Sequence, residues 1–316
     1  MKHQIITLCS KFRMTSRGLV LISHGSPSAE WNLGMEAIAD RVRAFFSEKG
    51  STEFKMVKLA HLEFATPTIA DVCDEFEANG IERIIALPIF ISVSSHTNLD
   101  IPNALNIGFN VDSETEIRRY VGKLPVTLCP PLDHGALLPR VIAEAASVIS
   151  TDSSNECALL LSHGDGCEHF WNHLHRRVAM AVTERTGVKE VRWVTVQTGR
   201  SEASKARFKD AVAEIAKVPD CSKVLILSCF TGLSGAGFLG RLAGRGAPST
   251  SECPVLIGDK GWNSNPLLAE HISNLAETAA KVCSGVSEQK KISQEEEKDL
   301  PPYNPPFYLT RDMPRH

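Results

Sequence analysis

Residues 18–26 read GLVLISHGS, and residues 157–165 read CALLLSHGD, 139 positions further along the chain. Each segment is an apolar run of about five residues that ends in Ser-His-Gly. Short apolar runs are typical of strands that are buried on both faces of a parallel sheet. The glycine after each histidine allows a tight turn at the strand end. The two segments therefore predict two similar strand–turn units.

The similarity between the two halves of the chain continues beyond these segments. Residues 84–90 (IIALPIF) match residues 224–230 (VLILSCF) at an offset of 140. Residues 125–142 match residues 254–272, where paired leucines and isoleucines lie 130 positions apart. Because the offset falls by about ten, the first half carries extra residues, which we place just after His96. The chain therefore contains an internal repeat.

The repeat alternates short apolar runs with amphipathic helical patterns, such as those at 28–48 and 168–186. This alternation predicts a parallel sheet with helices on both faces, and right-handed crossovers favour the strand order 2-1-3-4. We expect an α/β protein with two flavodoxin-like lobes, each a four-stranded parallel sheet, and a cleft between them. The predicted strands of the first lobe lie near 18–23, 55–61, 83–90 and 125–129.

The predicted lobes leave a segment at each end of the chain. The first lobe spans 18–150 and the second spans 156–285. Residues 1–17 hold four Lys or Arg and no acid, and we expect a poorly ordered leader. Residues 286–316 are charged and then proline-rich, a composition typical of a disordered tail.

Composition excludes several classes of protein. The 316 residues are 43% hydrophobic and 22% charged, with a net charge of −3. That balance gives no basic field for nucleic acid, and no apolar run approaches the ~20 residues of a membrane helix. The nine cysteines include no C-x-x-C pair, which favours reduced thiols in a cytoplasmic protein. We expect a monomer or homodimer.

Three ionisable residues of the first lobe follow predicted strands: His24 the first, Glu63 the second and His96 the third. Ligands of doubly wound sheets bind beyond the carboxyl ends of the strands, so these side chains are expected to converge. Two imidazoles and a carboxylate suit a divalent transition metal. The alternative is that each histidine only makes a structural hydrogen bond.

The second lobe retains less of this set. His163 aligns with His24, but Arg200 falls near the position of Glu63, and Ala236 takes the position of His96. We therefore expect the complete site in the first lobe alone. His169, His173 and His175 follow in a helical pattern without the H-E-x-x-H frame, which favours a partly exposed polar helix face.

The segments HGS (24–26), LEFATPTIADV (62–72) and SHTNLDIP (95–102) resemble the sirohydrochlorin chelatases of the CbiX type, a group of class II chelatases. The resemblance covers most of 18–142 and, more weakly, 157–272. His24 and His96 match the two active-site histidines of the family, and Glu63 matches its acidic residue. The resemblance implies catalytic and metal-binding roles for these three residues.

The resemblance also implies a lyase that inserts a divalent metal into sirohydrochlorin, as a cobaltochelatase first and a ferrochelatase second. The metal (Co²⁺, Fe²⁺ or Ni²⁺) is then a substrate, and no cofactor is permanently bound. The pathway would be cobalamin or siroheme biosynthesis. Because the tetrapyrrole carries carboxylates, we predict that His163, Arg200 and Arg241 bind it. The alternative is a non-catalytic carrier of metal or tetrapyrrole.

Overall fold

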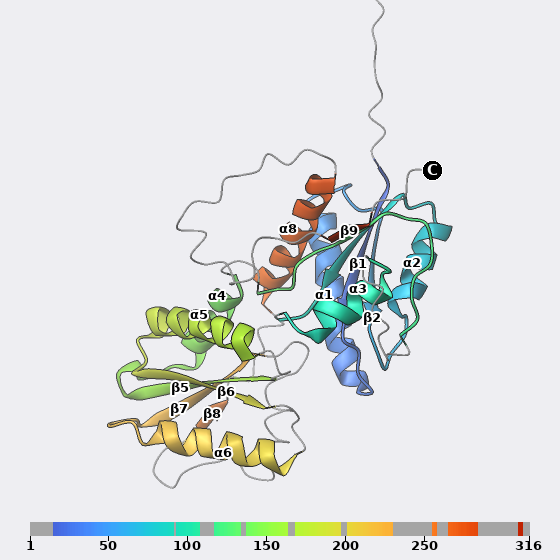
Figure 1. Cartoon of the computed structure of the whole chain (residues 1–316). Helices are drawn as coiled ribbons and strands as arrows, with labels where there is room; N and C mark the ends of the chain where they lie inside the picture. Colours follow the sequence, from blue (N-terminus) through green and yellow to red (C-terminus); the bar gives the residue numbers. More distant parts are fainter. Residues whose placement is uncertain are drawn as a thin grey trace, which may run out of the picture.

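The computed structural model contains two β-sheets with helices packed on both faces (Figure 1). The leader residues 1–14 lie outside the part of the chain that the structure describes. The described residues are 15–91, 93–107, 117–133, 137–163, 168–196, 201–229, 255–257, 265–283 and 309–311.

Sheet A has the strand order β2-β1-β3-β4-β9, and its first four strands run parallel. The order 2-1-3-4 that the sequence predicts is therefore confirmed. Leu19, Val20, Leu21 and Ile22 are completely buried, as the apolar run of the first strand requires. The parallel strands are β1 (Arg17–Ser23), β2 (Met56–His61), β3 (Arg83–Pro88) and β4 (Val126–Leu128).

Sheet B repeats this order as β6-β5-β7-β8, again with parallel strands. Its central strand β5 leads into the second Ser-His-Gly segment, just as β1 leads into the first. The internal repeat thus corresponds to two sheets of one topology. The strands are β5 (Glu156–His163), β6 (Glu190–Val196), β7 (Lys223–Cys229) and β8 (Val255–Ile257).

A tail segment adds the fifth strand to sheet A. The strand β9 (Leu309–Arg311) pairs antiparallel with β4, so that Leu309 lies opposite Leu128. The prediction of a wholly disordered tail is wrong for these three residues. Composition predicted disorder because prolines and charges cannot form a core, but an edge strand needs only backbone hydrogen bonds.

Each sheet is covered on both faces. In sheet A, α1 (Ala29–Glu48) and α8 (Pro266–Cys283) cover one face, and α2 (Ile69–Ala78) and the short α3 (Ile101–Ala104) cover the other. Local sequence starts these helices: Thr68 and Asp71 form a capping box at α2. In sheet B, α4 (Leu137–Ile149) and α5 (Glu168–Thr186) oppose α6 (Glu202–Ala216) (Figure 1).

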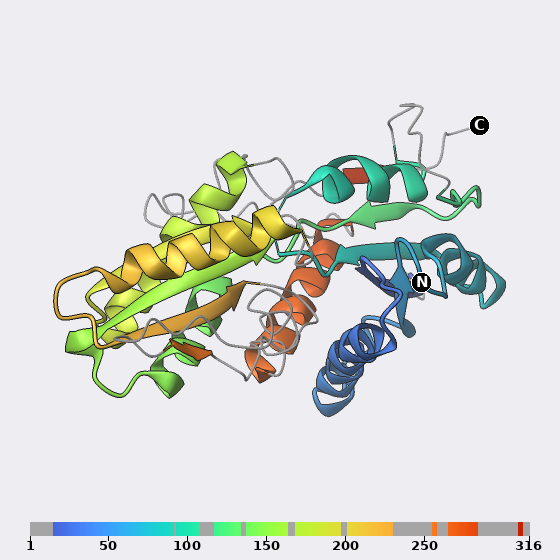
Figure 2. The ribbon, with the colours of Figure 1, turned by 90° about the horizontal axis from the view of Figure 1, so that it is seen from below.

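The last helix of each repeat packs on the other repeat. Helix α4 follows the strands of sheet A, yet it packs against α5 and β7. Helix α8 follows the strands of sheet B, yet it packs against α1 and β3. Figure 2 shows α8 in the middle of the molecule, and α4 also contacts it. One hydrophobic core therefore runs between the sheets, although the predicted lobes divide the sequence near residue 150.

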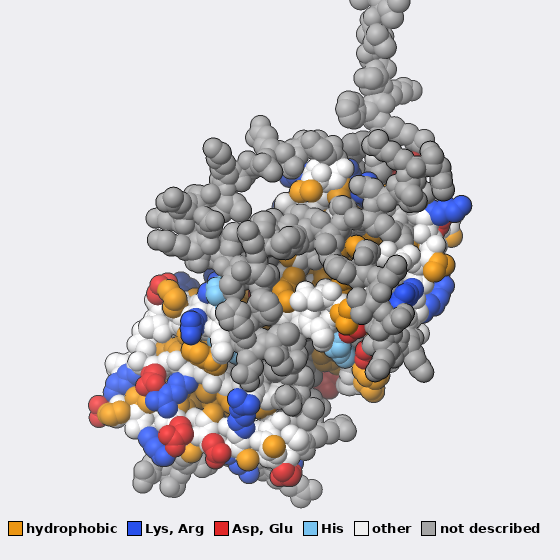
Figure 3. All heavy atoms as spheres, in the orientation of Figure 1, with side chains coloured by type: hydrophobic (Ala, Val, Ile, Leu, Met, Phe, Trp, Pro, Cys, Tyr) orange, Lys and Arg blue, Asp and Glu red, His pale blue; other side chains and the backbone are white. Residues whose placement is uncertain are grey.

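Charges of both signs are interspersed over the lobe that contains sheet B, on the face shown in Figure 3. None of the helices in the described ranges combines the length and hydropathy that a membrane crossing requires. No disulfide joins the cysteines of these ranges.

A buried carboxylate at the start of β5 gives a prediction about acid stability. Burial alone would raise the pKa of Glu156, but hydrogen bonds from Lys223, Ser150 and the Thr151 backbone outweigh burial and hold it at about 2. The unfolded chain takes up a proton near pH 4.5, whereas the folded chain does so only near pH 2. Stability is therefore present above pH 4.5 and lost as the pH falls toward 2.

We expect Glu156→Gln to lower the free energy of unfolding at pH 7 by roughly 3 kcal/mol. The gap between wild type and variant should shrink as the pH falls from 5 to 2, as followed by urea denaturation at each pH. The exposed Glu202 provides a control, because Glu202→Gln should leave the unfolding free energy nearly unchanged. A gap that stays constant over this pH range would contradict the assigned role of Glu156.

Candidate active site

The predicted site residues lie at the carboxyl-terminal edge of sheet A. His24 directly follows β1, Glu63 comes two residues after β2, and His96 begins the π-helical turn η1 (His96–Asp100) after β3. Backbone hydrogen bonds of 2.9 Å, including one from Glu63 N to His24 O, extend the pairing of β1 and β2 past the strand ends. The topology therefore brings the three backbones to one edge, as the sequence predicts.

The two histidine rings are in contact. Their centroids lie 4.7 Å apart and the ring planes meet at 76°, an edge-to-face arrangement. The ring of Phe90 lies 6.3 Å from His24 and 6.1 Å from His96. Both histidines are half-buried, so each ring is partly accessible to solvent.

Each imidazole uses its Nδ1 in a hydrogen bond to an oxygen acceptor. His24 Nδ1 donates to the Gly25 carbonyl at 2.9 Å, and His96 Nδ1 donates to Asp100 Oδ2 at 2.7 Å. The proton is then on Nδ1 in both rings, which leaves the two Nε2 lone pairs for a metal ion or a proton. Histidines that bind metals usually have this arrangement.

The position of Glu63 is defined by backbone hydrogen bonds, whereas the two histidines contact each other through their rings. Its side chain is half-buried, and its backbone bonds fix its place beside His24. Among the described residues, no three His, Cys, Asp or Glu side chains form a group that could hold a metal ion. The contribution of Glu63 as catalytic group and third ligand stays a prediction.

The turn after β1 depends on Gly25. Its φ is +82°, and a Cβ at this position would lie 1.8 Å from the Glu63 carbonyl oxygen. The next turn holds Phe64 with φ at 59°, an uncommon conformation for a large side chain. The Phe64 ring is 65% exposed and lies 5.9 Å from the His24 ring at 27°. An exposed, nearly stacked aromatic ring thus borders the histidine pair.

Comparison with known proteins agrees with this geometry. The CbiX family model matches residues 18–148, the segment that contains His24, Glu63 and His96. The first lobe of this chain is therefore similar to the CbiX family, and we refer to it below as the CbiX lobe. A sirohydrochlorin cobaltochelatase from Saccharolobus solfataricus is 27% identical over 129 residues, which are 40% of this chain and 91% of the relative. One from Methanococcoides burtonii is 28% identical over 132 residues, which are 41% and 93%.

A solved structure resembles both lobes together. SirB from Bacillus subtilis, solved with Fe³⁺, has a TM-score of 0.60 and 16% identity, over 85% of this chain and 98% of its own. At this identity the likeness shows the fold alone. The sequence relatives match the CbiX lobe, whereas the fold likeness extends across the second lobe as well.

A third histidine of the CbiX lobe, at the end of β2, is bonded to the last residue of β1. His61 is buried, and its Nδ1 is hydrogen-bonded to Ser23 Oγ at 2.8 Å. Burial lowers the pKa of His61 and so favours the neutral ring. In the second lobe, Ser162 takes the place of Ser23 and bonds His175 Nε2 at 2.7 Å.

The prediction of a partly exposed face is wrong for His175. This residue is fully buried on α5 between Trp171 and Trp193, and burial lowers its pKa to about 4. The spacing of histidines on a helix does not tell which of them meet the sheet, so the pattern could not separate His175 from its neighbours.

The predicted tetrapyrrole contacts of the second lobe are only partly described. His163 ends β5 and lies opposite Val196 in register, as expected from its alignment with His24. Its side chain lies outside the described part of the structure, as do Arg200, Ala236 and Arg241. Their roles stay predictions.

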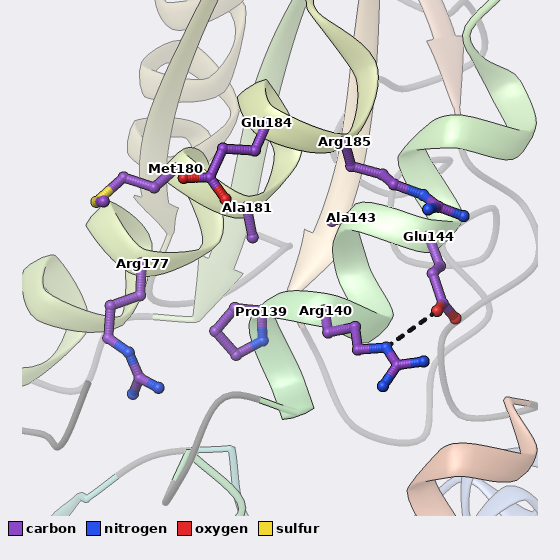
Figure 4. Close-up of a pocket in the computed structure, with 9 residues that line it drawn as sticks. All are labelled: Pro139, Arg140, Ala143, Glu144, Arg177, Met180, Ala181, Glu184 and Arg185. Carbon is purple, nitrogen blue, oxygen red and sulfur yellow. Dashed lines mark hydrogen bonds and ion pairs between the residues drawn. The ribbon is translucent and has the colours of Figure 1, made fainter. Parts of the chain in front are cut away.

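A groove of about 820 Å³ lies between α4 of the first lobe and α5 of the second, and none of the three predicted site residues lines it (Figure 4). Arg140 and Glu144 on its α4 wall form an ion pair at 3.3 Å. The remaining lining is mixed in charge. It consists of Pro139, Ala143, Arg177, Met180, Ala181, Glu184 and Arg185.

Two residues of the CbiX site are missing from the sequence interpretation. Asp100 accepts a hydrogen bond from His96. The sequence indication for this contact was the position of the acid, four residues after the histidine. Phe64 borders His24, but no pattern marks an exposed aromatic residue in a turn. Its position next to Glu63 was the available indication.

Proposed function

We propose that this protein inserts a divalent metal ion into sirohydrochlorin, with Co²⁺ as the first metal and Fe²⁺ as the second. The observation that carries the proposal is the contact between His24 and His96, 4.7 Å apart, with both Nδ1 atoms engaged elsewhere. Two neighbouring imidazoles with free Nε2 lone pairs can receive a metal ion, or accept protons, without a resident cofactor.

Metal insertion requires a proton acceptor and a metal site that releases its ion, and the histidine pair suits both requirements. A free-base tetrapyrrole must lose two pyrrole protons, and neutral imidazoles are suitable acceptors near neutral pH. The metal must be released after it is bound, and a site with few protein ligands holds it less tightly than a closed one. Glu63 would complete the ligand set or relay protons.

The surroundings of the pair suit a flat, partly apolar substrate. The exposed ring of Phe64 provides an apolar surface beside His24, where the face of a macrocycle would remove it from water. Carboxylate side chains of the macrocycle would then reach cations of the second lobe. We assign this contact to Arg200, Arg241 and His163.

Cobalt is placed first because the relatives of the CbiX lobe are named cobaltochelatases. Imidazole and carboxylate ligands do not by themselves select among Co²⁺, Fe²⁺ and Ni²⁺, since affinity follows a general order and supply decides. Insertion of Co²⁺ would place the protein in cobalamin biosynthesis, and insertion of Fe²⁺ would place it in siroheme biosynthesis.

The test is anaerobic incubation of the protein with sirohydrochlorin and each metal, followed by absorption spectroscopy. We expect the spectrum of the metallated product to appear faster than in protein-free mixtures, with Co²⁺ ahead of Fe²⁺ and Ni²⁺ at equal concentrations. Binding of metal or tetrapyrrole without any acceleration would reject the enzyme in favour of a carrier. A faster reaction with Fe²⁺ would overturn the order of metals.

A further inference from the structure

The carboxylate of Asp100 lies against one of the two histidines of the site and faces away from solvent. Its Oδ2 atom accepts a hydrogen bond from His96 Nδ1 at 2.7 Å, and its side chain is 9% exposed against 29% for His96. We propose that Asp100 is a positioning residue, which holds His96 in the tautomer and orientation that present Nε2 beside His24. The inference rests on the proposed function, but it can be tested separately.

Burial explains why this contact is more than a surface ion pair. A carboxylate that is removed from water is costly unless donors satisfy it. The Nδ1–H group of His96 is such a donor, so the two side chains constrain each other. By contrast, exposed histidine–acid pairs leave both partners free to exchange with water.

The backbone fixes Asp100 from both sides. It is the last residue of the π-helical turn, which Ile101 N closes onto His96 O. Ile101 and Ala104 in α3 are completely buried in the core of sheet A. Before the turn, Ser94 N donates to Thr97 Oγ1 at 2.8 Å. Turns of this π type occur often at functional sites, where they aim a side chain.

The hydrogen bond from His96 to Asp100 determines which of its two neutral tautomers the His96 ring adopts. A neutral imidazole carries its proton on Nδ1 or on Nε2, and only the first form has a free Nε2 lone pair. An ionised carboxylate accepts and cannot donate, so it selects the Nδ1–H form. His24 receives the same selection from the Gly25 carbonyl, which no side-chain substitution removes.

Asp100→Asn tests the inference with little change in shape. The amide can donate to Nδ1, which allows the Nε2–H tautomer and blocks the lone pair. Long-range ¹H–¹⁵N NMR spectra of labelled protein, with His96→Ala for assignment, should show Nδ1–H in the wild type and a shift toward Nε2–H in Asp100→Asn. We expect Co²⁺ affinity, measured by titration without tetrapyrrole, to fall 10–100-fold.

The kinetic readout separates positioning from a general structural effect. In Asp100→Asn, kcat for insertion should fall about as much as Co²⁺ affinity at a fixed metal concentration, while KM for sirohydrochlorin stays within about twofold. Glu156→Gln is the control, since it removes a buried carboxylate far along the chain in sheet B. It should lower stability without changing the His96 tautomer or Co²⁺ affinity.

Several outcomes would overturn the inference. An Nε2–H tautomer of His96 in the wild type would do so without any variant, even if Asp100→Asn failed to fold. Unchanged tautomer and Co²⁺ affinity in folded Asp100→Asn would do so as well. If the wild type bound Co²⁺ as expected but did not accelerate insertion, the proposed function would fail while the role of Asp100 stood.

Discussion

Replacing His96 by alanine is expected to slow metal insertion at least about a hundredfold while the protein stays folded. The ring contacts His24, and its Nδ1 is bonded to Asp100, so its Nε2 lone pair is the one left for a metal ion or a proton. His96 is half-buried and belongs to none of the hydrophobic core clusters of the described residues, so the stability cost should lie in the usual ~0.5–3 kcal/mol range.

His24→Ala is expected to have an effect of similar size, and the double variant should be little slower than either single one. Groups that act as a unit show such non-additivity, because the second substitution removes a function that is already lost. Initial rates give kcat/KM, and circular dichroism and thermal melts check the fold. Near-wild-type rates in a folded His96→Ala protein would reject the assigned site.

Gly25→Ala is expected to be the most damaging of the glycine substitutions, with a loss of about 2–4 kcal/mol and of insertion activity. The new Cβ would overlap the Glu63 carbonyl oxygen, which is backbone and cannot rotate away. Glu63 N is itself bonded to His24 O, so relief of the overlap must shift the backbone that holds His24 and Glu63.

Two other glycines provide matched controls for Gly25. Gly50 and Gly80 also have positive φ, of 60° and 70°, but a Cβ there would meet no atom within 4 Å. Their alanine variants should lose only the ~1 kcal/mol cost of the backbone conformation and retain activity. Denaturant titration of the three variants compares them directly. Equal losses in all three would show that the overlap with Glu63 is relieved at no cost.

Most of the sheet architecture could be predicted from the sequence, because each strand is a short apolar run bounded by turn residues. The predicted strand at 18–23 is Arg17–Ser23 in the structure, and 125–129 is Val126–Leu128. The sequence could not predict that α4 packs on sheet B and α8 on sheet A. Periodicity reveals that a helix has an apolar face, but it carries no information about which sheet covers that face.

The same distinction applies to the site. Strand ends of a parallel sheet share one edge, so the convergence of His24 and His96 follows from the predicted topology. The partner of His96 depends instead on the local turn, whose π-helical form places the Asp100 carboxylate at Nδ1 of the ring. A π-helical turn has no signature in composition or periodicity, so the spacing of the two residues indicates the contact but not the turn that makes it.

Because α8 packs on the first lobe, the core of that lobe can be completed only late in synthesis of the chain. Helix α1 ends at Glu48, and α8, which covers it, begins only at Pro266. A ribosome that adds about 5–20 residues per second therefore leaves the apolar face of α1 and β3 uncovered for about 10–40 s. During that interval the nascent CbiX lobe resembles a folding intermediate with an exposed core. Completion of its own core must wait until α8 has emerged from the ribosome.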